Sequence, residues 1–265
     1  MSIFWGEHTH EEIAEASRES AVVVLPVGAC EQHGPHLPVD TDIFQATEYA
    51  AAGARYAVEK HSLRVLLLPT IPYGDSSNHE AFVGTVFLPT DLLVRIVGEV
   101  LMQVAAQGFR RLVIVSGHGG NHPAISLAAR NARRAIRTAG GDAEVFHFHE
   151  GHRDGALRHA RREDPAAGSG NHAGGMETSL CLAKRESLVR RERIRPPKLR
   201  KANYEAPIYP ARVWMTDELT DSGSFGDPTG GAGATAAAGK TFWRAIGEDI
   251  GEFLKHVADY DPNVP

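Results

Sequence analysis

Residues 21–27 read AVVVLPV. A short, apolar and β-branched run of this kind is typical of a strand that is buried on both faces of a parallel sheet. Pro26 weakens that interpretation slightly, because proline cannot donate a hydrogen bond to a neighbouring strand. After a polar loop, the Ala-rich stretch 42–60 has apolar residues at helical spacing, with Thr41 or Asp42 available as the N-cap. The predicted order is strand, loop, helix.

The same order recurs along the first 150 residues. Further strands are predicted at 63–69, 111–116 and 143–149, and further helices at 90–107 and 123–138. Strands that alternate with helices of this length imply right-handed crossovers. The sequence therefore predicts an α/β fold, with a mainly parallel sheet flanked by helices on both faces.

Beyond residue 150 the pattern is less regular. We expect a polar helix after Gly151, a Gly/Ser/Asn loop at 166–171, an apolar helix at 176–184, an irregular stretch to Asp227 and a last helix at 232–260. Neither an internal repeat nor a linker requires a second domain. The chain is therefore interpreted as a single α/β domain over residues 1–265.

Composition excludes several classes of function. The 265 residues include 28 Lys+Arg and 33 Asp+Glu, which gives a formal net charge of −5. Nucleic acid is not expected as a partner, because neutralising its phosphates requires clustered cations. No apolar run approaches the roughly 18 residues of a membrane span, the first residues do not resemble a leader, and two cysteines cannot form a disulfide framework. We expect a cytoplasmic protein without a membrane partner.

Histidine is unusually frequent, with 14 residues against 10 phenylalanines. In parallel α/β sheets, ligands bind outside the carboxyl ends of the strands. Carboxylates occur beside the histidines of those segments, and imidazole mixed with carboxylate suits Zn²⁺, Mn²⁺ or Fe²⁺. The histidines in or near segments that follow strands are His33, His36, His79, His118, His122, His147, His149, His152 and His172, and the carboxylates are Glu31, Asp42, Glu150 and Glu177.

The loop after the first strand has the residues of a metal site. Glu31 and His33 are two positions apart on an extended segment and project to the same side, while a Gly/Pro-rich turn brings Asp42 back beside them. A carboxylate near the start of the next helix would suit a bridge between two cations. His118, in a glycine-rich turn between a strand and a helix, would point across the strand ends toward this loop. We prefer this interpretation to that of a merely solvated loop, and the glycines lack the spacing and the lysine of a phosphate-binding loop.

Four ordered motifs resemble those of one family. They are EQHGPHLP at 31–38 with Asp42, YGDS at 73–76 with His79 and Gly84-Thr85, GHGGN at 117–121, and HAGGMETS at 172–179. These motifs closely resemble those of the creatininase (creatinine amidohydrolase) family, from about residue 20 to about residue 240. The resemblance implies a creatininase-like βαβ architecture, a homo-oligomer that is often a hexamer, and two divalent metal ions per chain that serve to hydrolyse an amide C–N bond.

The resemblance also implies roles for individual residues. Glu31, His33, Asp42 and His118 look like metal ligands, with Asp42 bridging. Creatininase proper has a further glutamate ligand where this chain has Gly120, so Glu177 is the expected replacement, or else a proton-transfer group. His172 looks like the catalytic proton carrier. Ser76, His79 and His36 are assigned to substrate binding, although for Ser76 and His79 a hydrogen-bonded turn is an equal alternative.

Creatinine itself is not the expected substrate. Creatininase proper uses tryptophans near its late histidine and a tyrosine in its metal motif, whereas this chain has no tryptophan in 151–172 and has Gly119 in place of the tyrosine. We predict a hydrolase for a carbon–nitrogen bond other than a peptide bond, namely an amide, cyclic amide or N-formyl bond of a small molecule, attacked by a metal-activated water. Zn, Mn and Fe all suit the ligands.

Other functions remain open at this point. Deformylation of a pyrimidine nucleotide intermediate would require a basic phosphate pocket, for which the stretch 190–201 is the first candidate. A peptidase-like enzyme that matures a peptide-derived cofactor would require an open groove. A non-catalytic, metal-dependent binding protein is disfavoured, because a complete ligand set together with His172 exceeds what binding requires.

Overall fold

Four parallel strands form the centre of the molecule. The computed structural model describes residues 2–148, 172–200, 215–225 and 227–261. Within them, β1 (Val22–Val27), β2 (Val65–Leu67), β3 (Arg111–Ser116) and β4 (Glu144–Phe148) form a sheet in the order β2-β1-β3-β4, and all neighbouring strands are parallel. The predicted parallel sheet is confirmed.

Proline is tolerated in β1 because of where β2 ends. Pro26 is in register with Val115 of β3, and its carbonyl oxygen accepts a hydrogen bond of 3.0 Å from Ile71 N on the opposite side. That side lies beyond the end of β2 at Leu67, so the strand ladder does not need the missing N–H group.

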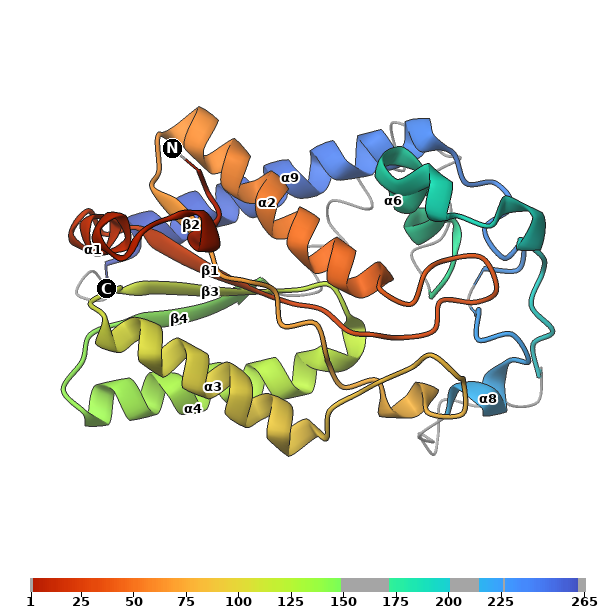
Figure 1. The fold of residues 1–265 in the computed structure, drawn as a ribbon, viewed down its shortest axis with the longest axis horizontal. Helices are drawn as coiled ribbons and strands as arrows, with labels where there is room; N and C mark the ends of the chain where they lie inside the picture. Colours follow the sequence, from red (N-terminus) through yellow and green to blue (C-terminus); the bar gives the residue numbers. More distant parts are fainter. Residues whose placement is uncertain (1, 149–171, 201–214, 226, 262–265) are drawn as a thin grey trace.

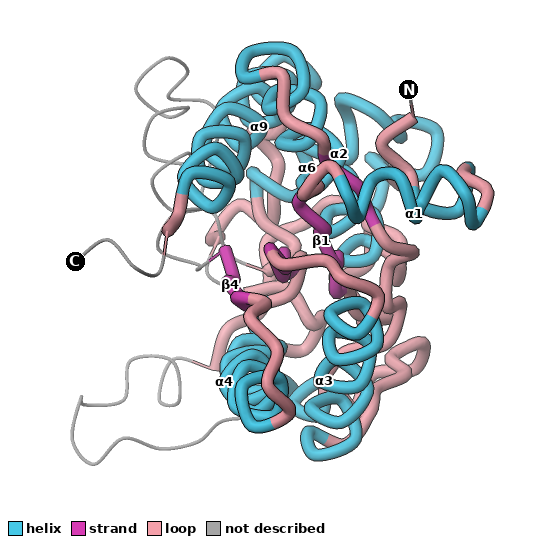
Figure 2. The backbone as a smooth tube through the Cα atoms, turned by 90° about the vertical axis from the view of Figure 1, so that its left-hand side faces the viewer, coloured by secondary structure: helices cyan, strands magenta, loops and turns pink. Residues whose placement is uncertain are grey.

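Helices cover both faces of the sheet, as predicted. Figure 1 shows α2 and α9 on one side and α3 and α4 on the other, and Figure 2 shows the same layers from the end of the molecule. The α-helices are α1 (His10–Arg18), α2 (Thr41–His61), α3 (Thr90–Ala106), α4 (His122–Thr138), α6 (Gly175–Arg185), α8 (Thr216–Leu219) and α9 (Ala236–Asp259). Short 3₁₀ helices are η1 (Trp5–Glu7), η2 (Ser77–His79), η3 (Gly119–Asn121), η5 (Glu186–Leu188) and η6 (Arg191–Arg193). The helix and loop expected at 151–171 lie outside the described residues.

Alternate residues of β1 enter two separate apolar cores. Val22 and Val24 pack in a cluster with residues of α2, α6 and α9, whereas Val23 and Leu25 pack in a cluster with residues of α1, α3 and α4. This alternation follows from the strand repeat of two residues. Full burial of one such side chain is worth about 1.5–3 kcal/mol, so β1 anchors both helical layers.

The start of α2 corrects one prediction. The N-cap is Asp40, whose side chain makes no capping hydrogen bond, and neither Thr41 nor Asp42 takes that position. The Thr41 hydroxyl donates to Pro38 O at 2.6 Å. Asp42 lies in the first turn, where its carboxylate faces His33 and His118. A side chain engaged with two imidazoles is not available to cap the helix backbone.

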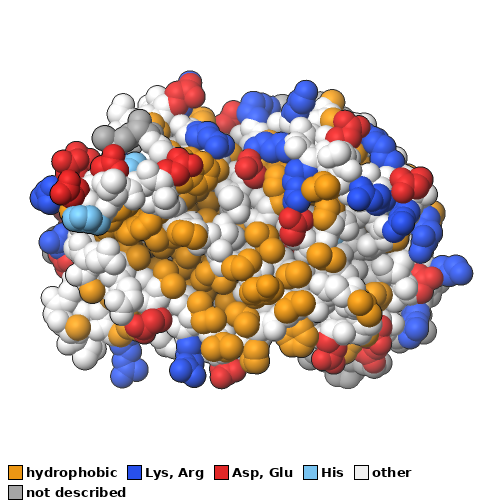
Figure 3. All heavy atoms as spheres, in the orientation of Figure 1, with side chains coloured by type: hydrophobic (Ala, Val, Ile, Leu, Met, Phe, Trp, Pro, Cys, Tyr) orange, Lys and Arg blue, Asp and Glu red, His pale blue; other side chains and the backbone are white. Residues whose placement is uncertain are grey.

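The face of the molecule that Figure 3 draws carries both apolar and charged groups. In Figure 3, hydrophobic side chains gather across the middle of the face, and basic and acidic side chains alternate around its margin. Among the described helices, none is both long enough and apolar enough to cross a membrane.

Candidate metal centre

Loops that follow two strands meet two helix starts at the carboxyl end of the sheet. Glu31 and His33 come from the loop after β1, and His118 comes directly after β3. Asp42 lies in the first turn of α2, and Glu177 lies in the first turn of α6. Carboxylates at these positions interact favourably with the helix dipole. All five predicted ligands are buried and belong to one cluster.

One triad joins Glu31, Asp42 and His118. His118 Nδ1 lies 3.1 Å from Asp42 Oδ2, and its Nε2 lies 3.2 Å from Glu31 Oε2. Ligand atoms of these three residues lie within 4.8 Å of one another. The same His118 Nε2 lies 2.9 Å from the carbonyl oxygen of Asp75, which can only accept a hydrogen bond. Nε2 therefore carries the proton, and Nδ1 is left to bind a cation.

A second triad shares Asp42 with the first. His33 Nε2 lies 3.2 Å from Asp42 Oδ1 and 3.7 Å from Glu177 Oε2, and the ligand atoms of this triad are again within 4.8 Å of one another. His33 Nδ1 donates to the carbonyl oxygen of Glu31 at 3.1 Å, which leaves Nε2 for a cation. Asp42 thus presents one carboxylate oxygen to each triad.

His172 closes the cluster on a third side. Its Nδ1 lies 3.3 Å from Glu31 Oε1, and ligand atoms of His172, Glu31 and His33 also lie within 4.8 Å of one another. The ring stacks on Phe225, with centroids 5.3 Å apart and an angle of 21° between the planes. The aromatic contact fixes the orientation of the imidazole beside the carboxylates.

Several buried atoms of the cluster lack a suitable hydrogen-bond partner. Both Glu31 oxygens, His33 Nε2 and Asp42 Oδ2 are buried and form no hydrogen bond of good geometry with any residue that the structure describes. Leaving such groups unpaired costs about 1–3 kcal/mol each, and more for charged ones. Because these atoms converge and belong to carboxylates and imidazoles, the cluster fits divalent metal ions.

The electrostatics support the same conclusion. Burial, together with the negative charge of Asp42, raises the pKa of Glu31 to about 7, although His118 acts in the opposite direction. Burial disfavours protonation of both ligand imidazoles, but the carboxylates raise the pKa of His33 to about 10 and that of His118 to about 9. Despite burial, these two imidazolium groups lower the pKa of Asp42. Protonated imidazoles supply the positive charge that bound cations would otherwise provide.

The three residues assigned to substrate binding are buried. Ser76 Oγ lies 3.4 Å from His118 Nε2, and His79 Nε2 lies 3.2 Å from Glu31 Oε1. Both therefore border the first triad. His36 instead contacts α6, where its Nε2 lies 2.9 Å from the Thr178 hydroxyl. That contact ties the loop after β1 to the helix that presents Glu177.

The structure also adds residues that the sequence analysis did not single out. Asn121 Nδ2 donates to Gly28 O at 2.9 Å, and its Oδ1 accepts from Asp75 N at 2.9 Å, so one side chain joins the loops after β1, β2 and β3. Gln32 contacts both His79 and His172. Asn121 and Gln32 lie inside quoted motifs, and this position could have indicated a role in the site. Nothing in the sequence indicated such a role for Phe225.

Gly120 cannot carry a larger side chain in this arrangement. A Cβ atom at Gly120 would overlap both the carbonyl oxygen of Asp75 and His118 Nε2. This crowding gives a physical reason for glycine at the position where creatininase proper has a glutamate.

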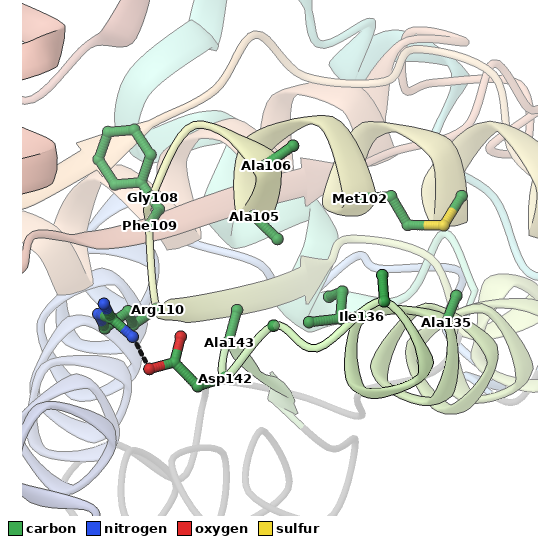
Figure 4. A pocket seen from close by; sticks show the side chains of 12 residues that line it. Met102, Ala105, Ala106, Gly108, Phe109, Arg110, Ala135, Ile136, Asp142 and Ala143 are labelled. Atoms are coloured by element: carbon green, nitrogen blue, oxygen red, sulfur yellow. Dashed lines mark ion pairs between the residues drawn. The ribbon is translucent and has the colours of Figure 1, made fainter.

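A separate cavity of about 370 Å³ lies between α3 and α4, near the amino ends of β3 and β4. Figure 4 shows its mostly apolar lining, including Met102, Phe109 and Ile136, and an ion pair between Arg110 and Asp142 at its edge. None of the lining residues belongs to the metal-type cluster.

Comparisons with known proteins show the family to which the chain belongs. The family model described as Creatininase: Creatinine amidohydrolase matches residues 6–254. The chain is 34% identical over 251 residues to the mycofactocin precursor peptide peptidase of Mycobacterium tuberculosis (strain CDC 1551 / Oshkosh), covering 92% of this chain and 87% of the relative. It is 31% identical over 224 residues to the creatinine amidohydrolase of Pseudomonas putida, covering 80% and 84%.

Solved structures show the same fold. A crystal structure of creatinine amidohydrolase (creatininase) superimposes with a TM-score of 0.79 at 26% identity, covering 98% of this chain and 99% of that one. A creatininase variant described as Zn-Zn type gives 0.80 at 25% identity, covering 98% and 100%. Fold and cluster together define an α/β protein with a buried imidazole–carboxylate site of the kind that binds divalent metals. The chain belongs to the creatininase family, and it is a hydrolase of that family.

Proposed function

We propose that this chain hydrolyses an amide C–N bond with the help of two divalent metal ions. Glu31, Asp42 and His118 would hold one ion, and His33, Asp42 and Glu177 the other. The observation that carries the proposal is that Asp42 presents one oxygen to each of two buried triads. When bound, two such cations lower the pKa of a shared water and polarise the carbonyl group of the amide.

The residues of the chain supply orientation and proton transfer. Asp42 fixes the separation of the two triads, and Glu31 contributes a second carboxylate to the first. Burial and the neighbouring His33 hold the pKa of His172 well below its ordinary value, so its ring is neutral at pH 7 and readily gives up a proton that it has received. His172 can then return that proton to the leaving nitrogen. Burial also lowers the pKa of His79 to about 3, which keeps a second neutral ring beside Glu31.

A peptide is the first candidate substrate. The relative named as a peptide peptidase shares 34% identity across 92% of this chain. The creatinine amidohydrolase shares 31% across 80%, and Gly119 and Gly120 occupy positions where creatininase proper has a tyrosine and a glutamate. A small cyclic amide or N-formyl compound is the second candidate, supported by that second relative.

Turnover by single-residue variants tests the proposal. Purified protein supplied with Zn²⁺ or Mn²⁺ is assayed against a panel of peptides, cyclic amides including creatinine, and N-formyl compounds. We expect Glu31→Gln and His172→Ala to lower kcat by about 10²- to 10⁴-fold. Exposed residues provide matched controls, Glu80→Gln and His256→Ala, which should keep full activity. Unchanged turnover in both site variants would remove the enzyme mechanism and favour a binding protein.

Metal analysis tests the site without any substrate. Protein purified without added metal salts should contain about two equivalents of divalent metal per chain. Absence of metal, together with no binding of Zn²⁺ or Mn²⁺ in a titration, would contradict the proposal. The homo-oligomer, and the hexamer in particular, stay predictions that light scattering can test.

A further inference from the structure

The side-chain amide of Gln32 has a defined orientation at the edge of the metal-type cluster. Gln32 is buried, and its Oε1 lies 2.9 Å from the backbone N–H of Gly34. An N–H group can only donate, so the atom that faces it must be the amide oxygen. Nε2 consequently points the opposite way, where it lies 2.6 Å from His79 Nδ1 and 3.2 Å from the carbonyl oxygen of Gly223.

This orientation determines the proton position on His79. Gln32 Nε2 is a donor, so His79 Nδ1 must be the acceptor and carries no proton. A neutral imidazole then has its proton on Nε2. His79 Nε2 lies 3.2 Å from Glu31 Oε1, so the proton faces the carboxylate of a proposed metal ligand.

The backbone of the same residue determines the proton position on His172. His172 Nε2 lies 2.7 Å from the carbonyl oxygen of Gln32, which can only accept. The same Nε2 also lies 3.0 Å from Gln32 Nε2, but the two protons of that amide already face His79 Nδ1 and the carbonyl oxygen of Gly223. His172 Nε2 therefore carries a proton, and the lone pair of the neutral ring is on Nδ1. That lone pair lies 3.3 Å from Glu31 Oε1. Two electron-rich atoms that face one another at this distance form a place that can accept a proton, which agrees with His172 as the proton carrier.

We propose that Gln32 is a positioning residue that sets the ring protonation of both active-site histidines, His79 through its side-chain amide and His172 through its backbone carbonyl. His79 then turns its Nε2 proton toward Glu31 Oε1, 3.2 Å away, while His172 presents a bare Nδ1 to the same carboxylate oxygen at 3.3 Å. The effect on catalysis rests on the proposed hydrolytic function, whereas the proton positions do not.

The surroundings leave the amide little freedom to rotate. Gly223 has a positive φ of 80°, and a Cβ atom at this position would overlap the Gln32 amide. The Gln32 backbone N–H donates to the Thr85 hydroxyl at 3.1 Å, which fixes the main chain from the other side. Gln32 is thus held between the loop after β2 and the loop that contains Gly223.

Nitrogen NMR of histidine-labelled, metal-free protein tests the proposal directly, because ¹⁵N shifts distinguish the two neutral forms of the ring. The wild type should show His79 and His172 both protonated on Nε2. A wild-type His79 that carries its proton on Nδ1 would overturn the proposal before any variant is made.

Two variants separate the side chain from the backbone. In Gln32→Glu an acceptor faces His79 Nδ1, so the proton should move to Nδ1. In the uncharged Gln32→Met no group fixes His79, and both forms should appear. His172 should keep its Nε2 proton in both variants, because the carbonyl group remains. The matched control is Gln103→Glu, on the exposed face of α3. If His79 has the same form in Gln32→Glu, Gln32→Met and wild type, the proposal is wrong.

Metal binding and kinetics provide a second measurement. Loss of the His79 contact should weaken Zn²⁺ binding or lower kcat by about 10- to 100-fold, the usual effect of removing a group that orients a ligand. KM should change less than kcat, because Gln32 acts on the substrate only through the histidines. If no substrate is ever turned over, the hydrolytic function fails, and the NMR result still decides the role of Gln32. Unaltered Zn²⁺ affinity and kcat in both Gln32 variants would overturn the positioning role.

Discussion

Asp42 and His36 illustrate how the neighbours of a buried residue determine its protonation state. Asp42 faces His33 and His118 with separate oxygens, and burial leaves no water to replace either contact. His36 is equally buried but faces a hydroxyl, so burial, with a smaller contribution from His33, lowers its pKa to about 4. Around His33 and His118 the charge of Asp42 and its neighbouring carboxylates outweighs the cost of burial, whereas around His36 burial decides.

Asp42→Asn should reduce the metal content from about two equivalents to one or fewer, because the amide keeps the shape but removes the charge shared by the two triads. Metal analysis after dialysis measures the effect. Asp40→Asn is the matched control: Asp40 is two residues away and pairs with Arg185 at 2.8 Å. Equal metal content in both variants would contradict the shared role of Asp42.

The stability of metal-free protein should fall between about pH 6.5 and pH 4, partly because of His36. In this window His36 is protonated in the unfolded chain but neutral in the folded protein, because folding lowers its pKa from 6.5 to about 4. The free energy of unfolding therefore rises with pH there, with a contribution of up to about 1.4 kcal/mol per pH unit.

Urea unfolding at pH 7.5 and pH 5.0 measures this contribution. His36→Gln removes the titrating group, so its free energy of unfolding should fall less on acidification than that of the wild type. An identical pH dependence in the two proteins would contradict a lowered pKa of His36 in the folded state.

At the scale of elements, helix contacts hold in place the two helices that carry carboxylates of the metal-type cluster. α2 carries Asp42 and α6 carries Glu177, and both helices pack extensively against α9. Close approach depends on small residues: a Cβ atom at Gly53 of α2 would overlap the Ile250 side chain of α9. The position of the metal-type cluster thus depends on packing far from the cluster itself.

Gly53→Ala should lower the free energy of unfolding by about 1 kcal/mol or more, because overpacking costs about 1–3 kcal/mol and outweighs the better helix propensity of alanine. The matched control is Gly98→Ala in the interior of α3, where an added Cβ would have no neighbour within 4 Å. That substitution should stabilise the protein by up to about 1 kcal/mol. Chemical denaturation of both variants measures the difference, and a change of the same sign in both would contradict the packing argument.

At the scale of the whole molecule, the site joins segments that are distant in the sequence. Residues 31 and 177 belong to one cluster, and Asn121 links the loops after three strands. A ligand that binds only this assembled arrangement stabilises the folded state through its binding free energy.

Divalent metal should therefore raise the melting temperature. At a free metal concentration of 100 Kd, one site adds about 2.7 kcal/mol, and each kcal/mol corresponds to roughly 2–4 °C for a chain of this size. Calorimetry with Zn²⁺ and with a chelator measures the shift. Glu31→Gln should show a clearly smaller shift than the control Glu80→Gln, and equal melting temperatures with and without metal would contradict a structural contribution of the site.

Local patterns explain why much of the fold was predictable. β3 has the predicted bounds, α3 and α4 differ from the prediction by one residue at one end, and α2 differs by one residue at each end. The agreement arises because strand and helix periodicity depends on neighbours in the sequence. The N-cap of α2 was predicted wrongly, because tertiary contacts of Asp42 outweigh local capping. Glu31, His33, Asp42, His118, His172 and Glu177 were predictable from their motifs, and the structure brings them together.

The sequence by itself determined the alternation of strands and helices, the parallel sheet and the list of metal-type residues, because each follows from short-range patterns or from a motif. Only the tertiary structure decided which oxygen of Asp42 faces which histidine, that His36 contacts Thr178, and that Gln32 lies between His79 and His172. These contacts join residues up to 142 positions apart. Their geometry depends on how two apolar cores position the loops, which no local pattern contains.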